Sequence, residues 1–310
     1  MSDQAITGEH PQDEALKDAA PKQESAPKKH SNLFTRVLTV IVGLPILLAI
    51  IIFGGPWVWA ALMLVASFLA ALEYMRITNQ DEAPATRAIS AGLALIPAVA
   101  AYLFAGTKAP FVGDFSFMVI GAASALAIWG TFLFNCFRPR EIPKASSVIN
   151  GTLGCTLYVG VLFLFLALFK RDFTNGNAWL FTLMAMTLGS DTGAYFVGRK
   201  FGKHKLAPIL SPKKSIEGAV GGFCTALIAA IAAKYIAFPD IALWQMLLLA
   251  AISNFLAQMG DLSESLLKRA CGIKDSGNII PGHGGILDRV DALIFSAPWV
   301  YCFAWFITHN

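Results

Sequence analysis

The segment SLLKRACGIKDSGNIIPGHGGILDRVD, from Ser265 to Asp291, decides how the rest of this chain is interpreted. It is dense in charge, yet it lies between two apolar segments that are each long enough to cross a bilayer. Charged groups beside or within the hydrocarbon layer are costly unless they are paired or bound to metal. Carboxylates suit a hard cation such as Mg²⁺, and lysine and arginine suit phosphate. We therefore expect a metal-assisted phosphate site at a membrane surface, and its candidate residues here are Lys268, Arg269, Lys274, Asp275, His283, Asp288, Arg289 and Asp291.

The composition is that of a polytopic membrane protein. Of 310 residues, 56% are hydrophobic and only 14% are charged, with a mean hydropathy of +0.60; a soluble domain carries about 25% charged residues. Residues 1–32 are polar and poor in apolar side chains, which predicts a disordered cytosolic tail. The first apolar run begins too late for a signal peptide. The five cysteines form no CxxC pair, so we expect neither a disulfide framework nor a zinc site.

Apolar runs of about 20 residues predict an all-α, polytopic transmembrane helical bundle with about nine spans. The expected spans are Val37–Phe53, Trp57–Ala71, Ala88–Ala105, Phe115–Phe137, Val148–Phe169, Ala178–Val197, Ile216–Ile236, Ile241–Gly260 and Ala292–Thr308. The second span is short, and the first two are also compatible with one tilted hairpin around Gly54-Gly55-Pro56. We divide the chain into the tail (1–32), N-terminal transmembrane helices (33–175) and a catalytic transmembrane region with cytosolic loops (176–310).

The distribution of basic residues predicts the orientation. With nine spans and a cytosolic N-terminus, the 24 Lys and Arg residues all fall on the inner side except Lys108, Lys170, Arg171 and Lys234. This asymmetry follows the positive-inside rule. The two loops densest in charge, after the sixth and eighth spans, are therefore expected to face the cytosol, where nucleotides and Mg²⁺ are available.

The loop after the sixth span is a candidate phosphate-binding element. Asp191 lies inside the sixth apolar run among small residues, which favour close helix packing. Ser211-Pro212 suits the N-cap and first position of the next helix, a place that attracts anions. The alternative is a loop that only sets topology and touches lipid headgroups. Asp191 and Glu217 favour a functional role, because neither helps topology; the basic candidates with them are Arg199, Lys203, Lys213 and Lys214.

The end of the eighth span carries a second charged face. Asp261, Glu264 and Lys268 are spaced i, i+3 and i+7, and Asp288 and Asp291 are spaced i, i+3 where the ninth span begins. Ordinary carboxylate–lysine pairing at helix ends is the alternative, but it does not account for the glycine-rich turn at Pro281–Gly285. Elsewhere, Glu73 and Arg76 are expected to form an i, i+3 pair at a helix end.

At these residues the chain resembles the phosphatidate cytidylyltransferase family of the bacterial type, also called CDP-diacylglycerol synthases. Twelve positions match the family signature without a gap: Ser265, Lys268, Arg269, Lys274, Asp275, Pro281, His283, Gly284, Gly285, Asp288, Arg289 and Asp291. An upstream block matches as well, and it comprises Ser190, Asp191, Ala194, Tyr195, Gly198, Arg199, Gly202, Ser211, Pro212, Lys214, Glu217 and Gly218. The similarity covers roughly the last 130 residues.

The resemblance implies that CTP and phosphatidic acid react to give CDP-diacylglycerol and pyrophosphate, with Mg²⁺ required. It further implies a homodimer in the bacterial cytoplasmic (inner) membrane, with the N-terminus and the active-site loops cytosolic; no nucleic-acid partner is expected. Carried over from the family, Asp261 and Asp288 are the expected metal ligands. Lys268, Asp275 and His283 are the other expected catalytic residues. Arg199, Lys203, Ser211, Lys213, Lys214, Arg269, Lys274 and Arg289 are the expected substrate-binding residues, and Asp191, Glu217 and Asp291 the supporting carboxylates.

Three other functions remain open on the residues alone. A CTP-dependent lipid-alcohol kinase shares the need for a membrane site for nucleotide and metal. A transporter of anionic solutes needs charges around a central cavity, whereas here they gather at one face. A CDP-alcohol phosphotransferase has a different signature, which this sequence lacks.

Overall fold

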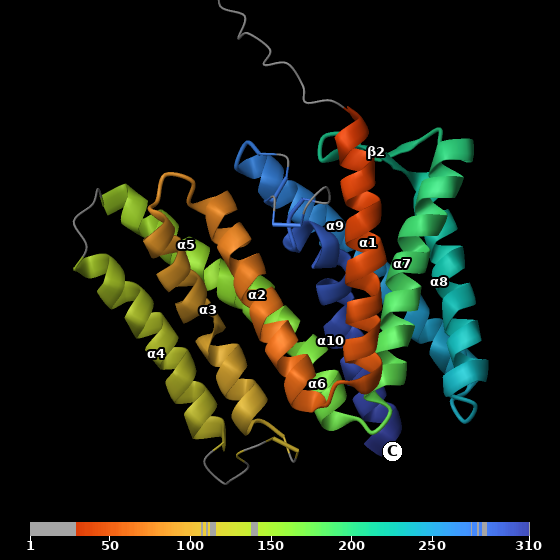
Figure 1. Ribbon diagram of the computed structural model, residues 1–310, viewed down its shortest axis with the longest axis horizontal. Coiled ribbons are helices and arrows are strands. Elements are labelled where there is room, and N and C mark those ends of the chain that lie inside the picture. Colours follow the sequence, from red (N-terminus) through yellow and green to blue (C-terminus); the bar gives the residue numbers. More distant parts are fainter. Residues whose placement is uncertain are drawn as a thin grey trace, which may run out of the picture.

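The structure is a computed structural model that describes residues 29–106, 108, 109, 111, 116–137, 142–273, 275–277, 279, 280 and 284–309. Within these residues the chain is almost entirely helical (Figure 1). The helices are α1 (Lys29–Phe53), α2 (Pro56–Thr78), α3 (Pro84–Phe104), α4 (Ser116–Cys136), α5 (Ile142–Cys155), the π-helix η1 (Thr156–Val161), α6 (Leu162–Asp172), α7 (Gly176–Phe201), α8 (Ile216–Ala237), α9 (Leu243–Ala270) and α10 (Leu287–His309). Two short strands, β1 (Lys205–Ala207) and β2 (Ser211–Ser215), form an antiparallel hairpin between α7 and α8.

The predicted all-α, polytopic membrane bundle is confirmed. Because α5, η1 and α6 follow one another without a break, the described residues form nine helical rods. Seven of these are long and apolar enough to cross a membrane. The apolar part of α1, Thr39–Phe53, is shorter, and α7 carries the polar run Gly189–Gly193.

Helix boundaries differ from the apolar runs in instructive ways. Helices α2 and α3 begin at Pro56 and Pro84, because a helix's first turn does not need the N–H that proline lacks. Helix α2 continues past the predicted end at Ala71 to Thr78, and it is separate from α1. Helix α9 likewise continues beyond Gly260 to Ala270, so its charged residues lie on a continuous helix. Residues 1–28 of the predicted tail lie outside the described residues. The rest of the predicted tail, residues 29–32, belongs to α1, which begins at Lys29.

Close packing between α7 and α8 is the most extensive helix contact, and α9 packs similarly against α10. A methyl group added at Gly193 would lie 2.3 Å from Thr225 Oγ1, and Thr225 itself donates to the Gly189 carbonyl at 2.9 Å. The prediction that small residues around Asp191 allow close approach is therefore confirmed. On the other side of the bundle, α6 packs against α2 and α10, which joins the N-terminal helices to the C-terminal ones.

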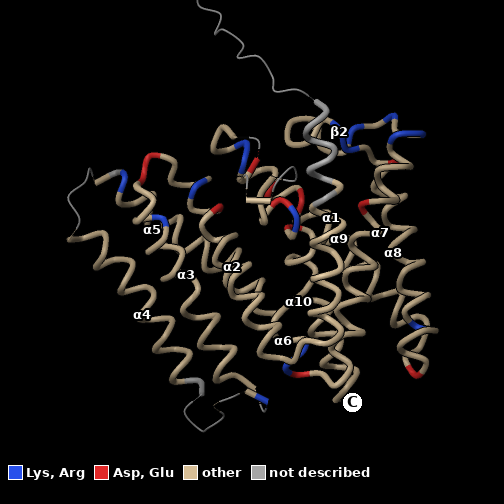
Figure 2. The backbone as a smooth tube through the Cα atoms, in the orientation of Figure 1, with Lys and Arg blue, Asp and Glu red and all other residues tan. Residues whose placement is uncertain are grey.

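Charged residues gather at the end of the bundle that carries the β-hairpin, and few lie at the opposite end (Figure 2). The four basic residues expected at that opposite end all bind backbone carbonyls: Lys108 that of Asp172, Lys170 those of Ile50, Ile51 and Gly54, Arg171 those of Ala101 and Tyr102, and Lys234 that of Pro239. The carbonyls at α1 and α3 lie at the helices' C-terminal ends; those of Ile50 and Ala101 also accept from the backbone N–H groups of Gly54 and Ala105. These four exceptions to the charge asymmetry thus have a structural use.

Candidate active site

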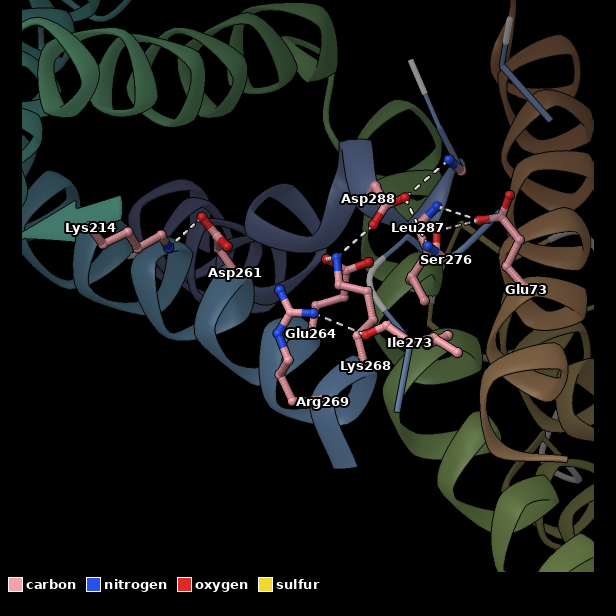
Figure 3. A network of polar contacts seen from close by, with 11 residues as sticks. Glu73, Lys214, Asp261, Glu264, Lys268, Arg269, Ile273, Ser276, Leu287 and Asp288 are labelled. Carbon is pink, nitrogen blue, oxygen red and sulfur yellow. Dashed lines mark hydrogen bonds and ion pairs between the residues drawn. The ribbon is translucent and has the colours of Figure 1, made fainter. Parts of the chain in front are cut away.

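Lys268 joins carboxylates from two helices at the charged end of the bundle (Figure 3). Its Nζ lies 2.6 Å from Glu264 Oε2, one turn earlier on α9, and 2.6 Å from Asp288 Oδ1 in the first turn of α10. The Glu264 side chain is 2% exposed and that of Lys268 12%. Because the removal of one member of a buried ion pair leaves an uncompensated charge, the three groups depend on one another. The charged face predicted on α9 therefore ties α9 to the start of α10.

The second oxygen of Asp288 holds the loop that precedes α10. Asp288 Oδ2 accepts hydrogen bonds from the backbone N–H groups of Ser276 and Gly285, each at 3.1 Å. Gly284, which directly precedes Gly285, has φ +88°, a conformation that glycine adopts without strain. A carboxylate in the first turn also interacts favourably with the positive end of the helix dipole. Asp288 is therefore fixed in place by α9, by the loop and by its own helix.

Asp261 lies beside a cavity of about 410 Å³ between α7, the hairpin, α8 and α9. Asp261 Oδ2 is ion-paired with Lys214 Nζ (Figure 3). The charge of Asp261 also acts on Asp191 and Asp291, so three carboxylates share one electrostatic environment. Five predicted site residues line this cavity from elements far apart in the sequence: Asp191, Arg199, Lys213, Lys214 and Asp261.

The other predicted residues have varied positions. Asp291 is buried, whereas Lys203, Asp275, Arg269 and Arg289 are exposed. Arg269 Nη1 donates to the Ile273 carbonyl just past the end of α9. Lys274 and His283 lie outside the described residues, as do Pro281 and Gly282 of the glycine-rich turn.

Two predictions about the loop between α7 and α8 are wrong. Ser211 and Pro212 do not start a helix; they belong to β2, which pairs with β1 through Lys205↔Ser215 and Ala207↔Ser211. The N-cap of α8 is Ser215, whose hydroxyl accepts from the Gly218 N–H at 3.1 Å. Lys213 and Lys214 therefore project from a hairpin rather than from a helix N-terminus.

Glu217, an expected supporting carboxylate, lies in the first turn of α8 beside the hairpin. Its carboxylate accepts from the backbone N–H groups of Lys203 and His204, and Oε1 lies 2.6 Å from His204 Nδ1. Glu217 thus fastens the start of the hairpin to α8. His204, which the sequence did not single out, is its partner.

Glu73 is the residue that sequence reasoning misjudged most. The expected pair with Arg76 gives way to a buried contact with the loop before α10: Oε1 accepts from Ile286 N at 3.0 Å, and Oε2 accepts from Leu287 N at 2.8 Å and Ser276 Oγ at 3.2 Å (Figure 3). The only signal in the sequence was a carboxylate next to an apolar run.

A second residue that the sequence did not indicate is Tyr158, on η1. Its buried hydroxyl has no hydrogen-bond partner among the described residues, and the charges of Asp291 and Glu264 act on it. Glu264 Oε1 is likewise buried without a described partner. Single π-helical turns recur at functional sites, which agrees with this position.

The donor chemistry fits a hard cation, although the described residues hold no cluster of three or more His, Cys, Asp or Glu arranged to bind one. Carboxylate oxygens are what Mg²⁺ prefers, and several lie at this end of the bundle. Asp261 and Asp288 are each paired with a lysine, and Figure 3 shows them facing different partners. Their assignment as metal ligands stays a prediction.

Comparison with known proteins gives a consistent result. The sequence model of the cytidylyltransferase family matches residues 34–307. A phosphatidate cytidylyltransferase of Staphylococcus haemolyticus is 34% identical over 265 residues, which cover 85% of this chain and 95% of that protein. The phosphatidate cytidylyltransferase of Staphylococcus aureus strain COL is 33% identical over the same shares of both chains. That of Bacillus subtilis is 41% identical over 145 residues, 47% of this chain and 54% of that protein.

Proposed function

The chain belongs to the cytidylyltransferase family, and from this premise we propose that it transfers the cytidylyl group of CTP to phosphatidic acid. The products are CDP-diacylglycerol and pyrophosphate, which places the enzyme in phospholipid biosynthesis. The relatives' name supports this substrate pair, and so does an integral membrane fold with its charged residues at one end.

The observation that carries the proposal is the cavity between α7, the hairpin, α8 and α9. Arg199, Lys213 and Lys214 give it cationic walls, and Asp191 and Asp261 give it carboxylates. A triphosphate needs both kinds of group, because cations bind its oxygens and carboxylates hold the metal that accompanies it. Lys268 lies further along α9, the helix that carries Asp261, and pairs with Asp288 at the start of α10.

The reaction needs positioning more than it needs a base. A phosphate oxygen of phosphatidic acid attacks the α-phosphorus of CTP; a new P–O bond forms, and the bond to the pyrophosphate oxygen breaks. The attacking phosphate monoester is already anionic near neutral pH, so no strong general base is required. The difficulty is to bring two anions together, and fixed cations in a partly buried site reduce their repulsion. Lys214 and Arg199, which line the cavity, would bind phosphate oxygens of the nucleotide.

Mg²⁺ is the cofactor that these residues would suit, with Asp261 and Asp288 as its ligands and Asp191 and Asp291 as supporting carboxylates. When bound, it would neutralise charge on the triphosphate and its leaving group. In the structure Lys214 and Lys268 supply the positive charge that these carboxylates need. The proposal extends to a homodimer in the bacterial cytoplasmic membrane with the charged end of the bundle in the cytosol.

Labelled CTP tests the proposal against the alternative, a CTP-dependent lipid-alcohol kinase. Purified protein receives CTP labelled either at the α-phosphate or at the γ-phosphate, together with phosphatidic acid or diacylglycerol, with and without Mg²⁺. We expect Mg²⁺-dependent transfer of the α-label to phosphatidic acid and no transfer of the γ-label. Lipid that carries only the γ-label would overturn the proposal in favour of the kinase.

A further inference from the structure

Glu73 lies outside every signature segment, yet it makes the most complete contact with one of them. The residue is on α2, is 1% exposed, and is separated from Ser276 by 203 positions in the sequence. Both of its carboxylate oxygens accept hydrogen bonds, from one hydroxyl and two backbone N–H groups. A buried carboxylate is costly to hold in an apolar bundle unless such bonds satisfy it. The contact is therefore a built feature of the fold.

The loop is shaped to admit this carboxylate. A methyl group added at Gly277 would lie 2.8 Å from Glu73 Oε1, and one added at Gly285 would lie 2.5 Å from Oε2 and 2.0 Å from Ser276 Oγ. No larger residue fits at either position unless Glu73 or the loop moves. The second glycine of the Gly284-Gly285 pair is thus explained by the approach of Glu73, whereas Gly284 is explained by its positive φ.

Glu73 and Asp288 hold the same short piece of backbone from two sides. Ser276 donates its N–H to Asp288 and its hydroxyl to Glu73. At the start of α10, the backbone N–H of Gly285 donates to Asp288, and those of Ile286 and Leu287 donate to Glu73. Glu73 therefore caps α10 from another helix and satisfies N–H groups that the helix itself cannot. The turn whose position it sets carries Asp288, the partner of Lys268.

We propose that Glu73 is a positioning residue for the reaction: it fixes the first turn of α10 and thereby aims Asp288 and Lys268 at the substrates. The inference rests on the proposed function for its kinetic consequence, but not for its structural one. It assigns a role in the active site to the N-terminal half of the chain, which contributes no signature residue. A displacement of about 1 Å at such a group lowers a rate by about 100-fold.

Glu73→Gln is the central test, because it keeps the shape, removes the charge and turns an NH₂ group toward N–H donors. Ser67→Ala is the matched control: Ser67 is also buried on α2, but its hydroxyl donates only to the Leu64 carbonyl of its own helix. Ser276→Ala is a milder second variant that removes one bond to Glu73 and leaves the backbone bonds in place. Each is purified in detergent and assayed per mole of folded protein.

We expect Glu73→Gln to lower kcat at least about tenfold while the KM for CTP stays within about twofold, since the nucleotide cavity is formed by other helices. Ser276→Ala should lower kcat by about threefold, and Ser67→Ala should leave it unchanged. Hydrogen exchange in residues 284–290 should become faster in Glu73→Gln and stay as in the wild type in Ser67→Ala.

A kcat of Glu73→Gln within about twofold of the wild type, with unchanged exchange in the loop, would overturn the inference. So would a loss of activity that merely follows a loss of folded protein. If Glu73→Gln does not fold, Ser276→Ala decides by the same two measurements. If the wild-type protein makes no CDP-lipid, the proposed function fails, and the exchange data alone still decide whether Glu73 positions the loop.

Discussion

Asp261 and Asp288 each form an ion pair with a lysine. At the scale of single residues, the loss of either carboxylate therefore removes one partner of an ion pair. Asn keeps the shape of Asp but drops its charge. We expect Asp261→Asn and Asp288→Asn each to abolish CDP-lipid formation, because these carboxylates would hold the metal ion that neutralises charge on the triphosphate. CDP-lipid formation at saturating Mg²⁺, with folding checked by thermal melting, measures the effect. Asp240→Asn, at the opposite end of the bundle, is the control.

If either variant keeps more than about a tenth of wild-type activity, a barrier difference of about 1.4 kcal/mol, the aspartate that was replaced is not a principal metal ligand. That residue's role would then be limited to its contacts in the structure. For Asp288 these are Lys268 and the loop, and for Asp261 the contact is Lys214.

Lys213 and Lys214 are adjacent in the sequence but unequal in the structure. Both line the cavity, and only Lys214 pairs with Asp261. We expect Lys214→Gln to raise the KM for CTP about tenfold and Lys213→Gln about twofold, with expression and detergent stability nearly unchanged in both. Initial rates over a range of CTP concentrations measure this. If a variant with both substitutions kept wild-type kinetics, the role of the two hairpin lysines would be limited to topology.

Spacing in the sequence identified contacts that lie within one helix turn, but not those that lie across helices. Glu264 and Lys268 were placed on one face and do pair. Glu73 was assigned to Arg76 by the same rule, and its partners are instead in the loop before α10. Nothing local distinguishes the two cases, because the choice depends on which helices pack together.

At the scale of elements, the start of α8 offers a direct test of the corrected hairpin. Ser215, the last residue of β2, caps the helix and is buried, whereas Ser211 is the first residue of β2. Ser215→Ala should lower stability by about 1 kcal/mol, the usual effect of losing an N-cap. Ser211→Ala should leave the melting temperature in detergent unchanged. Equal shifts for the two variants would contradict the position of the cap.

Helices were predicted well where apolar runs define them and poorly where polar residues continue them. Hydropathy reports the depth of a segment in the membrane, whereas a helix ends where its backbone bonds end. Helix α9 therefore extends through Asp261 and Lys268 to Ala270, past its apolar run. The π-helix η1 had no signature in the sequence, since it is one extra residue per turn inside an apolar segment. The hairpin was missed because Ser-Pro followed by an apolar run also fits a helix start.

At the scale of the whole molecule, the charge asymmetry predicted from the sequence is present in the fold, with charged residues gathered at the end that holds the hairpin and α10's first turn (Figure 2). The exceptions, Lys170 and Arg171 among them, bind carbonyls at the ends of α1 and α3. These contacts give the basic residues at the far end a structural role, and the orientation expected from the positive-inside rule stays a prediction. The division at residue 175 stays a prediction, although Glu73 shows that α2 contacts the C-terminal loop.

Orientation itself is testable with single cysteines in a variant whose five native cysteines are replaced. Lys203 and Asp275 are exposed at the charged end, and Asp240 is exposed at the opposite end; Ser276 is unsuitable because it is buried against Glu73. If the charged end faces the cytosol, as the positive-inside rule predicts, cysteines at Lys203 and Asp275 should resist an impermeant thiol reagent in intact bacterial cells and react in opened membranes. A cysteine at Asp240 should react in both. Labelling of Lys203→Cys or Asp275→Cys in intact cells, with Asp240→Cys protected, would reverse the orientation and put the nucleotide cavity on the side without CTP.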